Sequence, residues 1–168
     1  MDTGSSSART DVSMLVQIAT DADIPAWLAL AAEVEHMFGP MVNSSDFLNA
    51  LSNNIKRGSA FCVRAGDTSP GEPLLGGLLF SAKPPQYRIG WLAVAEGCRR
   101  QGVGSLLVAH ALSLVEPPAE VTVTTFGEDN PAGHPARRLY ERFGFEPAEL
   151  ASNGPEDGTR QLFRMSVV

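Results

Sequence analysis

The stretch Arg99-Arg100-Gln101-Gly102-Val103-Gly104-Ser105 decides how this sequence is interpreted. It lies between a strand-like run, Ile89 to Val94, and an apolar run of helical length, Val103 to Val115. Two glycines therefore mark the entry to a helix, where the backbone can approach a ligand closely and the first amides have no helical acceptor. Such a junction favours an anion and is well suited to a diphosphate.

Two familiar phosphate loops do not fit this stretch. A Walker loop needs Gly-Lys-Ser/Thr at the helix entry, and a dinucleotide loop needs a third glycine where Leu107 stands. The stretch does match Arg/Gln-x-x-Gly-x-Gly/Ala after a strand ending in Ala-Val. Residues 136–145, Ala-Arg-Arg-Leu-Tyr-Glu-Arg-Phe-Gly-Phe, match a second pattern, Ala-x-x-x-Tyr-Glu-x-x-Gly-Phe. In these two ordered motifs the chain resembles the GCN5-related N-acetyltransferase (GNAT) superfamily.

The resemblance implies a fold and a co-substrate. The fold is the α/β acyl-CoA N-acyltransferase fold, a mixed, mostly antiparallel twisted sheet with helices on both faces. In it, the strand ending at Val94 and the strand Val121 to Phe126 splay apart at the cofactor site. The implied co-substrate is acetyl-CoA, and no metal is implied.

The resemblance also implies which residues bind the cofactor. A bulged strand leaves backbone groups free for the pantetheine arm, here at Leu92, Ala93 and Val94. The diphosphate is expected on the amides of Gln101, Gly102, Val103, Gly104 and Ser105. Arg99 or Arg100 is expected to add charge at the rim, the alternative being that both are simply solvated.

Tyr140 occupies the tyrosine position of the second motif, which implies that it contacts the cofactor and protonates the departing thiolate. A phenol with a pKa of about 10 can donate a proton or hydrogen bond to a thiolate whose conjugate acid lies near 8.5. The alternative is that Tyr140 only packs in the core. One departure from the family concerns Gly133, which stands where an asparagine is common, with Asn130 three residues earlier.

A general base is harder to assign, because the family has no fixed position for it and its frequent strand glutamate is missing here. An amine with a lysine-like pKa of about 10.4 is mostly protonated at neutral pH, so a base or a water chain is required. Glu33, Glu35 and His36 are the candidates, with Glu35 and His36 favoured. The alternative, which a single glutamate on a helix favours, is that Glu33 and Glu35 are carboxylates on a solvated helix surface.

Apolar periodicity predicts the remaining elements. Strands are expected at 14–19, 60–65, 74–81, 87–94, 121–126, from 145 onward and around 163–167. Helices are expected at 25–38, 44–58, 103–115 and from about 135 to 143. The third helix is predicted to be deeply buried. The side chains predicted to face away from the core on the fourth helix are Arg137, Arg138, Glu141 and Arg142.

Composition limits the class of protein. A chain of 168 residues with 43% hydrophobic residues favours one domain, here 14–168 after a disordered tail at 1–13. A net charge of −6 argues against nucleic-acid or membrane partners and mildly favours a cationic acceptor. Cys62 and Cys98 form no metal or disulfide framework, which favours the cytoplasm. No stretch reaches the roughly 18 apolar residues of a membrane helix.

The sequence therefore predicts an N-acetyltransferase that moves an acetyl group from acetyl-CoA to a primary amine by direct attack in a ternary complex. The acceptor is a small-molecule amine or a peptide or protein amine. A non-catalytic acyl-CoA sensor is the main alternative, and a plain tight turn in a structural protein is another. A homodimer is compatible with the sequence, which does not specify the oligomeric state.

Overall fold

The computed structural model describes residues 15–66, 68–154 and 158–168. The predicted tail at 1–13 lies outside these residues. The strands are β1 (Val16–Ile18), β2 (Ala60–Arg64), β3 (Leu74–Lys83), β4 (Gln86–Val94), β5 (Ala119–Phe126), β6 (Glu146–Ala151) and β7 (Arg160–Val167). The helices are α2 (Ile24–Phe38), α3 (Ser45–Arg57), α4 (Val103–Ser113) and α5 (His134–Arg142), with 3-10 turns η1 (Asp21–Asp23), η2 (Glu96–Cys98) and η3 (Pro131–Gly133). Each predicted strand and helix is present, with ends that differ by a few residues.

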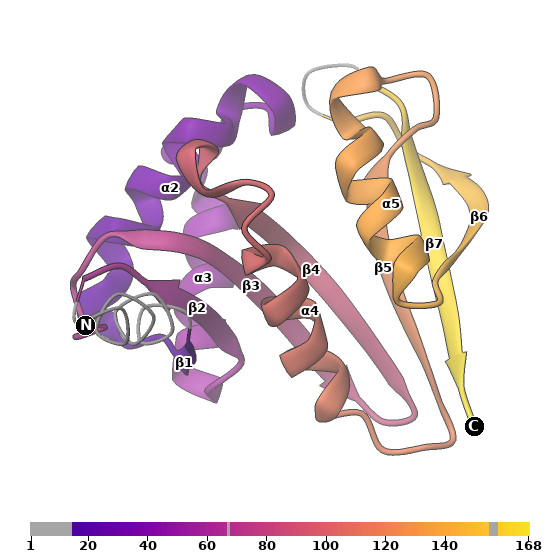
Figure 1. The fold of residues 1–168 in the computed structure, drawn as a ribbon, viewed down its shortest axis with the longest axis horizontal. Helices are drawn as coiled ribbons and strands as arrows, with labels where there is room; N and C mark the ends of the chain where they lie inside the picture. The colour runs from indigo at the N-terminus through magenta and orange to yellow at the C-terminus, as the bar shows by residue number, and fades with distance from the viewer. Residues whose placement is uncertain (1–14, 67, 155–157) are drawn as a thin grey trace, which may run out of the picture.

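The strands form one sheet in the order β1-β2-β3-β4-β5-β7-β6. All neighbouring pairs are antiparallel except β4 and β5. That parallel pairing covers only Gln86–Ile89 against Glu120–Val123. Beyond it the two strands diverge, which confirms the predicted splay (Figure 1).

Helices cover both faces of the sheet (Figure 1). α2 and α3 pack on one face, against β2, β3 and β4, while α4 and α5 pack on the other. Two adjacent glycines of β3 allow this close approach from both sides. A Cβ on Gly76 would lie 2.6 Å from Val103 Cγ1 of α4, and a Cβ on Gly77 would lie 2.8 Å from Trp27 Cζ2 of α2.

Local sequence signals set the bounds of α3. Ser44 is its N-cap, and the Ser44 hydroxyl accepts a hydrogen bond from Phe47 N at 3.4 Å. Gly58 ends the helix with φ +73°, in the left-handed region that glycine tolerates. These are the start and stop that the sequence predicted.

Two burial predictions were wrong. Arg137 is buried, because α5 lies flat on β5 and β7; its Nη1 donates to Phe126 O at 3.0 Å and Gln161 Oε1 at 2.8 Å. Its guanidinium also lies 4.9 Å from the centroid of the Phe163 ring. α4 is covered on one face only, so Leu106 and Leu114 are exposed. Apolar residues all round a helix do not by themselves reveal how much of it the sheet covers.

A buried ion pair connects η1 to β2. Arg64 Nε and Nη2 donate to the two carboxylate oxygens of Asp23 at 2.9 and 2.7 Å. The carboxylate also accepts from the amides of Gly71 and Thr20. Burial alone would raise the pKa of Asp23, but the hydrogen bonds from Arg64, Gly71 and Thr20 outweigh it and lower the pKa to about 2.

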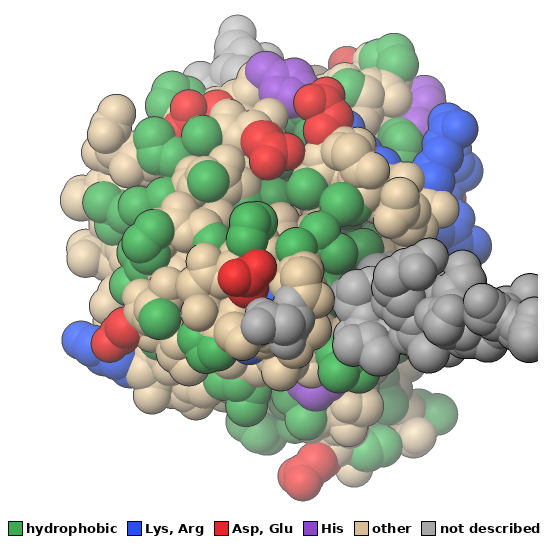
Figure 2. Space-filling view, turned by 60° about the vertical axis from the view of Figure 1, so that its left-hand side comes forward, with side chains coloured by type: hydrophobic (Ala, Val, Ile, Leu, Met, Phe, Trp, Pro, Cys, Tyr) green, Lys and Arg blue, Asp and Glu red, His purple; other side chains and the backbone are tan. Residues whose placement is uncertain are grey.

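Charge is dispersed on the face shown in Figure 2, which brings forward the left-hand side of Figure 1. Hydrophobic side chains spread across this face, single acidic side chains lie among them, and Lys and Arg lie mostly at its margins. Among the described residues, no helix is both long enough and apolar enough to cross a lipid bilayer.

Candidate active site

Three cavities follow the gap between β4 and β5. The loop cavity, of about 510 Å³, lies beside α4 and α5, and the α3 cavity, of about 420 Å³, lies beside α2 and α3. The middle cavity, of about 110 Å³, shares Val94 and Arg99 with the first, and Phe38 and Leu92 with the second. The three cavities therefore lie next to one another along the gap, with α4 and α5 beside the first and α2 and α3 beside the last.

The glycine loop and the start of α4 form one wall of the loop cavity. Gly102 is the N-cap, with φ +86°, and the first helical hydrogen bond runs from Leu106 N to Gly102 O at 3.0 Å. The amides of Val103, Gly104 and Ser105 precede that bond and have no helical acceptor. Arg100 also has a positive φ, +67°, which is unusual for a residue with a Cβ. The loop is thus shaped so that backbone donors and the helix dipole meet at the cavity.

Arginines from two elements surround the loop cavity. Arg99 and Arg100 come from the loop, as predicted, and both are exposed. Arg142 comes from α5 and was missed by the sequence analysis. It follows Pro135 and Leu139 at helical spacing, and these three residues form the face of α5 that lines the cavity. That spacing was readable from the sequence once α5 had been placed opposite α4.

The edge of β4 offers unpaired backbone groups to the gap. Ala95 N donates to Leu75 O at 2.8 Å, and Val94 lies opposite Gly76. Because backbone groups alternate along a strand, Leu92 and Val94 direct their N–H and C=O groups away from β3 and into the gap. Ala93 directs its own toward β3. A register shift at Gly90 places the expected bulge just before this segment.

Tyr140 is held in the core with its hydroxyl at the α3 cavity. Its ring packs against Phe145 and Phe163, at centroid distances of 5.7 and 6.3 Å. The side chain is 4% exposed and lines the cavity, yet none of the described residues hydrogen-bonds its hydroxyl. Burial raises the pKa of Tyr140 well above its ordinary value. The phenol therefore stays protonated and has a free donor.

The carboxylates and the histidine considered as bases lie outside these cavities. Glu35 Oε2 accepts hydrogen bonds from Met41 N and Val42 N at 2.7 and 2.9 Å, and these bonds lower the Glu35 pKa. Glu33 Oε1 accepts from Glu96 N at 3.1 Å. His36 is exposed and does not line any of the three cavities. The contacts of Glu35 and Glu33 suit stabilisation of loops better than proton transfer.

The structure explains the glycine at the family's asparagine position. A Cβ on Gly133 would lie 2.2 Å from Phe126 Cβ, so no side chain fits there. The Asn130 carboxamide accepts a hydrogen bond from Ala132 N at 3.1 Å and caps η3. Neither residue directs a side-chain amide into the gap.

Aromatic side chains dominate the α3 cavity, and two charged residues line it. Phe38 of α2 stacks on Phe126 of β5, with centroids 5.0 Å apart and an interplanar angle of 29°. The guanidinium of Arg160, on β7, lies 4.6 Å from the centroid of the Phe126 ring. Asp46, in the first turn of α3, is the carboxylate on the wall. Asp46 was not predicted as a site residue, because an acidic residue in the first turn of a helix is expected on stability grounds alone.

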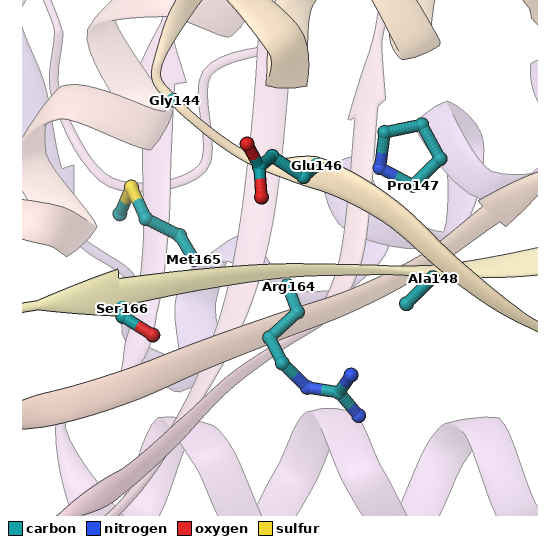
Figure 3. Close-up of a pocket in the computed structure, with 7 residues that line it drawn as sticks. All are labelled: Gly144, Glu146, Pro147, Ala148, Arg164, Met165 and Ser166. Carbon is teal, nitrogen blue, oxygen red and sulfur yellow. The ribbon is translucent and has the colours of Figure 1, made fainter.

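A further cavity, of about 340 Å³, lies outside this gap, along β6 and β7 (Figure 3). The Arg164 side chain turns away from Glu146 there. Its guanidinium pairs with Glu120 Oε2 at 2.9 Å and with Glu149 Oε2 at 3.2 Å. The guanidinium that lines this cavity is therefore already paired with carboxylates of neighbouring strands. Within the described part of the chain, no group of three His, Cys, Asp or Glu residues could hold a metal ion.

Solved structures share this fold over almost the whole chain. One is Ard1 from Thermoplasma volcanium, with 18% identity, coverage of 94% of this chain and 99% of that one, and a TM-score of 0.71. Another is Arabidopsis thaliana Naa50 in complex with the bisubstrate analogue CoA-Ac-MVNAL, with 18% identity, coverage of 93% and 100%, and a TM-score of 0.71. A third is the ribosomal-protein-S18-alanine N-acetyltransferase from Escherichia coli, with 16% identity, coverage of 91% and 93%, and a TM-score of 0.70. No curated protein sequence matches the chain.

At such identities the likeness concerns the fold alone, and that fold is the one of GNAT-type acetyltransferases. The sequence pattern that defines the acetyltransferase (GNAT) domain family matches residues 57–147, more than half of the chain. The chain belongs to this family. The superfamily, the fold and the enzyme class inferred from two short motifs are thereby confirmed.

Proposed function

We propose that this protein transfers an acetyl group from acetyl-CoA to a primary amine by direct attack of the amine on the thioester. The observation that carries the proposal is the row of three neighbouring cavities along the gap between β4 and β5. A helix N-terminus with arginines lies at one end, and an unpartnered phenol lies in the aromatic cavity at the other. A long phosphorylated thioester and an amine can reach one another from opposite faces.

The donor is held by backbone groups and arginines. The diphosphate lies on the amides of Val103, Gly104 and Ser105, where the helix dipole favours negative charge, and Arg99 and Arg100 add charge-assisted contacts. The pantetheine arm follows β4 like an added strand and bonds to the free backbone groups of Leu92 and Val94. The amide of Val94 polarises the thioester carbonyl.

Because the free acceptor is mostly an ammonium ion at neutral pH, it first loses one proton to solvent water, and the transfer itself then balances without a further acid or base. The neutral amine nitrogen attacks the carbonyl carbon, the C–S bond breaks, the new amide loses one proton, and the thiolate gains one. Tyr140 donates a hydrogen bond to the sulfur as negative charge develops there, and its raised pKa keeps the donor protonated at physiological pH.

Direct transfer is also supported by the state of the two cysteines. Burial, together with the nearby Glu33 carboxylate, raises the pKa of Cys98, which lines the loop cavity. Burial raises the pKa of Cys62 to about 11. Both remain thiols at neutral pH, and a thiol is a poor nucleophile compared with a thiolate. A covalent acetyl-cysteine intermediate is therefore disfavoured.

The donor site is tested by calorimetry with CoA on the parent protein and on Ser105→Glu. Ser105 lines the loop cavity, so a carboxylate there opposes the phosphates, and we expect at least a tenfold loss of affinity, about 1.4 kcal/mol. Ala109→Glu adds the same charge on the exposed side of α4 and should bind CoA like the parent. Equal binding by all three proteins would contradict a diphosphate site at this helix.

Turnover is tested by following free thiol during incubation with acetyl-CoA and a panel of amines. Acetyl-CoA binding without transfer to any amine would favour the sensor alternative. Parallel lines in double-reciprocal plots would indicate an acetyl-enzyme intermediate, whereas intersecting lines are expected for a ternary complex.

A further inference from the structure

The α3 cavity has walls that suit an aromatic or large apolar group. Its ring-bearing walls come from α2, α3, β4 and β5, through Phe38, Phe47, Trp91 and Phe126. The Trp91 ring is fixed by Phe47 at 5.4 Å, by Trp27 at 5.8 Å, and by a hydrogen bond from its Nε1 to Met41 Sδ at 3.3 Å. A rigid aromatic surface of this kind recognises flat, apolar molecules.

The charges on the cavity wall oppose a polycationic occupant. Asp46 is the only carboxylate among the described residues that line it. Arg160, on the same wall, already covers the Phe126 ring and donates to Thr159 O at 3.2 Å. A polyamine would bring several ammonium groups to one carboxylate and one guanidinium, and the surplus charge would be left without a partner.

Tyr140 lines this cavity, and its hydroxyl has no hydrogen-bond partner among the described residues. The side chain is more than nine-tenths buried, and its donor faces a space that the described protein does not fill with a polar group. Because Asp46 and Tyr140 line the same cavity, an amine within it has a carboxylate to meet its ammonium form and a phenol at the reacting end.

From these observations we infer that the acceptor is a primary amine attached to an aromatic or similarly large apolar group, and that Asp46 draws its ammonium form into the α3 cavity. This inference rests on the proposed function. Small arylalkylamines and peptides whose first residue is apolar share this chemistry. The test therefore includes an arm for each source.

The experiment measures kcat/KM at saturating acetyl-CoA for four pairs of acceptors. The pairs are 2-phenylethylamine with ethylamine, tryptamine with ethanolamine, a Phe-Ala-Ala peptide amide with its Gly-Ala-Ala counterpart, and 2-phenylethylamine with spermidine. Burial of the aromatic ring should favour the first member of each pair by on the order of a hundredfold. The first three pairs differ in the apolar group, and the fourth tests charge.

Asp46→Asn tests the carboxylate with the preferred acceptor. We expect KM for the amine to rise about tenfold, with kcat nearly unchanged, because Asp46 recognises the cation and does not touch the thioester. Asp21→Asn is the matched control, since Asp21 is exposed on η1 and lies outside the cavity. CoA affinity should be the same in the parent and in both variants.

The outcomes separate the two proposals. Efficient acetylation of spermidine or ethylamine, with no gain from an aromatic group, would overturn the inference and leave the acetyltransferase proposal standing. A KM that is equal in Asp46→Asn and the parent would overturn the role of Asp46. Binding of acetyl-CoA with no acetylation of any amine would overturn both proposals.

Discussion

Single residues near the gap between β4 and β5 make contacts that explain their identity. Gly133 lies against Phe126, and the two tyrosines buried near the gap differ in one respect. The Tyr87 hydroxyl accepts a hydrogen bond from Glu116 N at 3.2 Å, whereas the Tyr140 hydroxyl has no such partner among the described residues. The Tyr140 hydroxyl therefore remains available as a donor to a ligand in the α3 cavity, which Tyr140 lines, whereas the Tyr87 hydroxyl is already engaged by the backbone.

Removal of each phenol hydroxyl should give opposite results. Tyr140→Phe is expected to lower kcat about a hundredfold or more, with an unchanged or slightly higher melting temperature, because no hydrogen bond is lost. Tyr87→Phe should leave kcat unchanged and lower the free energy of unfolding by about 1 kcal/mol, because Glu116 N loses its acceptor. Steady-state kinetics and thermal unfolding of both variants check this. Equal kcat for Tyr140→Phe and the parent would exclude the acid role.

Gly133→Ala should destabilise the protein by about 1–3 kcal/mol, because the new methyl overlaps Phe126 Cβ and the backbone has to shift. Gly97→Ala is the control, since a Cβ there meets nothing within 4 Å. Urea denaturation of both variants measures the difference. If Gly133→Ala unfolds at the same urea concentration as the control, the close contact is not what excludes an asparagine at this position.

At the scale of elements, α5 contributes to both faces of the gap. Pro135, Leu139 and Arg142 lie on one face of α5 and line the loop cavity together with the glycine loop. Tyr140, on the buried face of the same helix, lines the α3 cavity. This is possible because β4 and β5 separate beyond Ile89. α5 therefore contributes a guanidinium to the lining of the loop cavity and a phenol to the lining of the α3 cavity.

Arg142→Gln is expected to weaken CoA binding about three- to tenfold, because it removes a positive charge from the lining of the loop cavity. Arg138→Gln removes the same charge from α5 at an exposed position that does not line the cavity. Calorimetry at two salt concentrations measures both. If the two variants lose affinity equally, Arg142 acts through the general field of the helix and does not contact a phosphate.

Local signals were sufficient to predict the elements and the position of the glycine loop at the start of α4. Ser44 and Gly58 bound α3, and the glycines at 102 and 104 lead into α4, because caps and turns depend on residues close in sequence. Sites formed by distant segments were not predictable in the same way. Asp46 of α3 and Arg160 of β7 are far apart in the sequence and line one cavity only because of the tertiary fold. The two amides that bind Glu35 depend on the loop after α2.

At the scale of the whole molecule, one buried ion pair fixes the N-terminal end of the described fold. Arg64 of β2 contacts Asp23 and also donates to Gln17 Oε1 at 3.0 Å, Ile18 O at 3.3 Å and Thr68 O at 3.2 Å. The start of α2, β1 and the β2–β3 connection thus share one guanidinium. Loss of the partner carboxylate would leave a buried charge unpaired.

This pair should make stability depend on pH. The Asp23 pKa is about 2 in the folded protein, below its ordinary 3.8, so the stability that it contributes is complete above about pH 5. That contribution, about 2 kcal/mol, is lost as pH falls from 3.8 through 2. Asp23→Asn should be less stable than the parent by about 3–5 kcal/mol at pH 7, and the difference should shrink at pH 2. Denaturant titrations at pH 7, 4, 3 and 2 measure it.

Asp21→Asn removes a charge from the same turn without removing a contact to Arg64, and serves as the control. A difference between Asp23→Asn and the parent that stays constant from pH 7 to pH 2 would contradict the pairing.

The short parallel ladder between β4 and β5 joins two half-sheets, of four and three strands, along only four residues of each strand. The two half-sheets are therefore joined by few backbone hydrogen bonds, and the rings of Phe38 and Phe126 stack beside the part where β4 and β5 are separated. An elongated molecule that hydrogen-bonds to the free backbone groups of β4 would add contacts between the two half-sheets and make their junction more rigid. Amide hydrogen exchange at Leu92 and Val94 should therefore be fast in the free protein and slow once a ligand occupies the gap. The bound reactant would then supply the backbone hydrogen bonds that β4 lacks on this side.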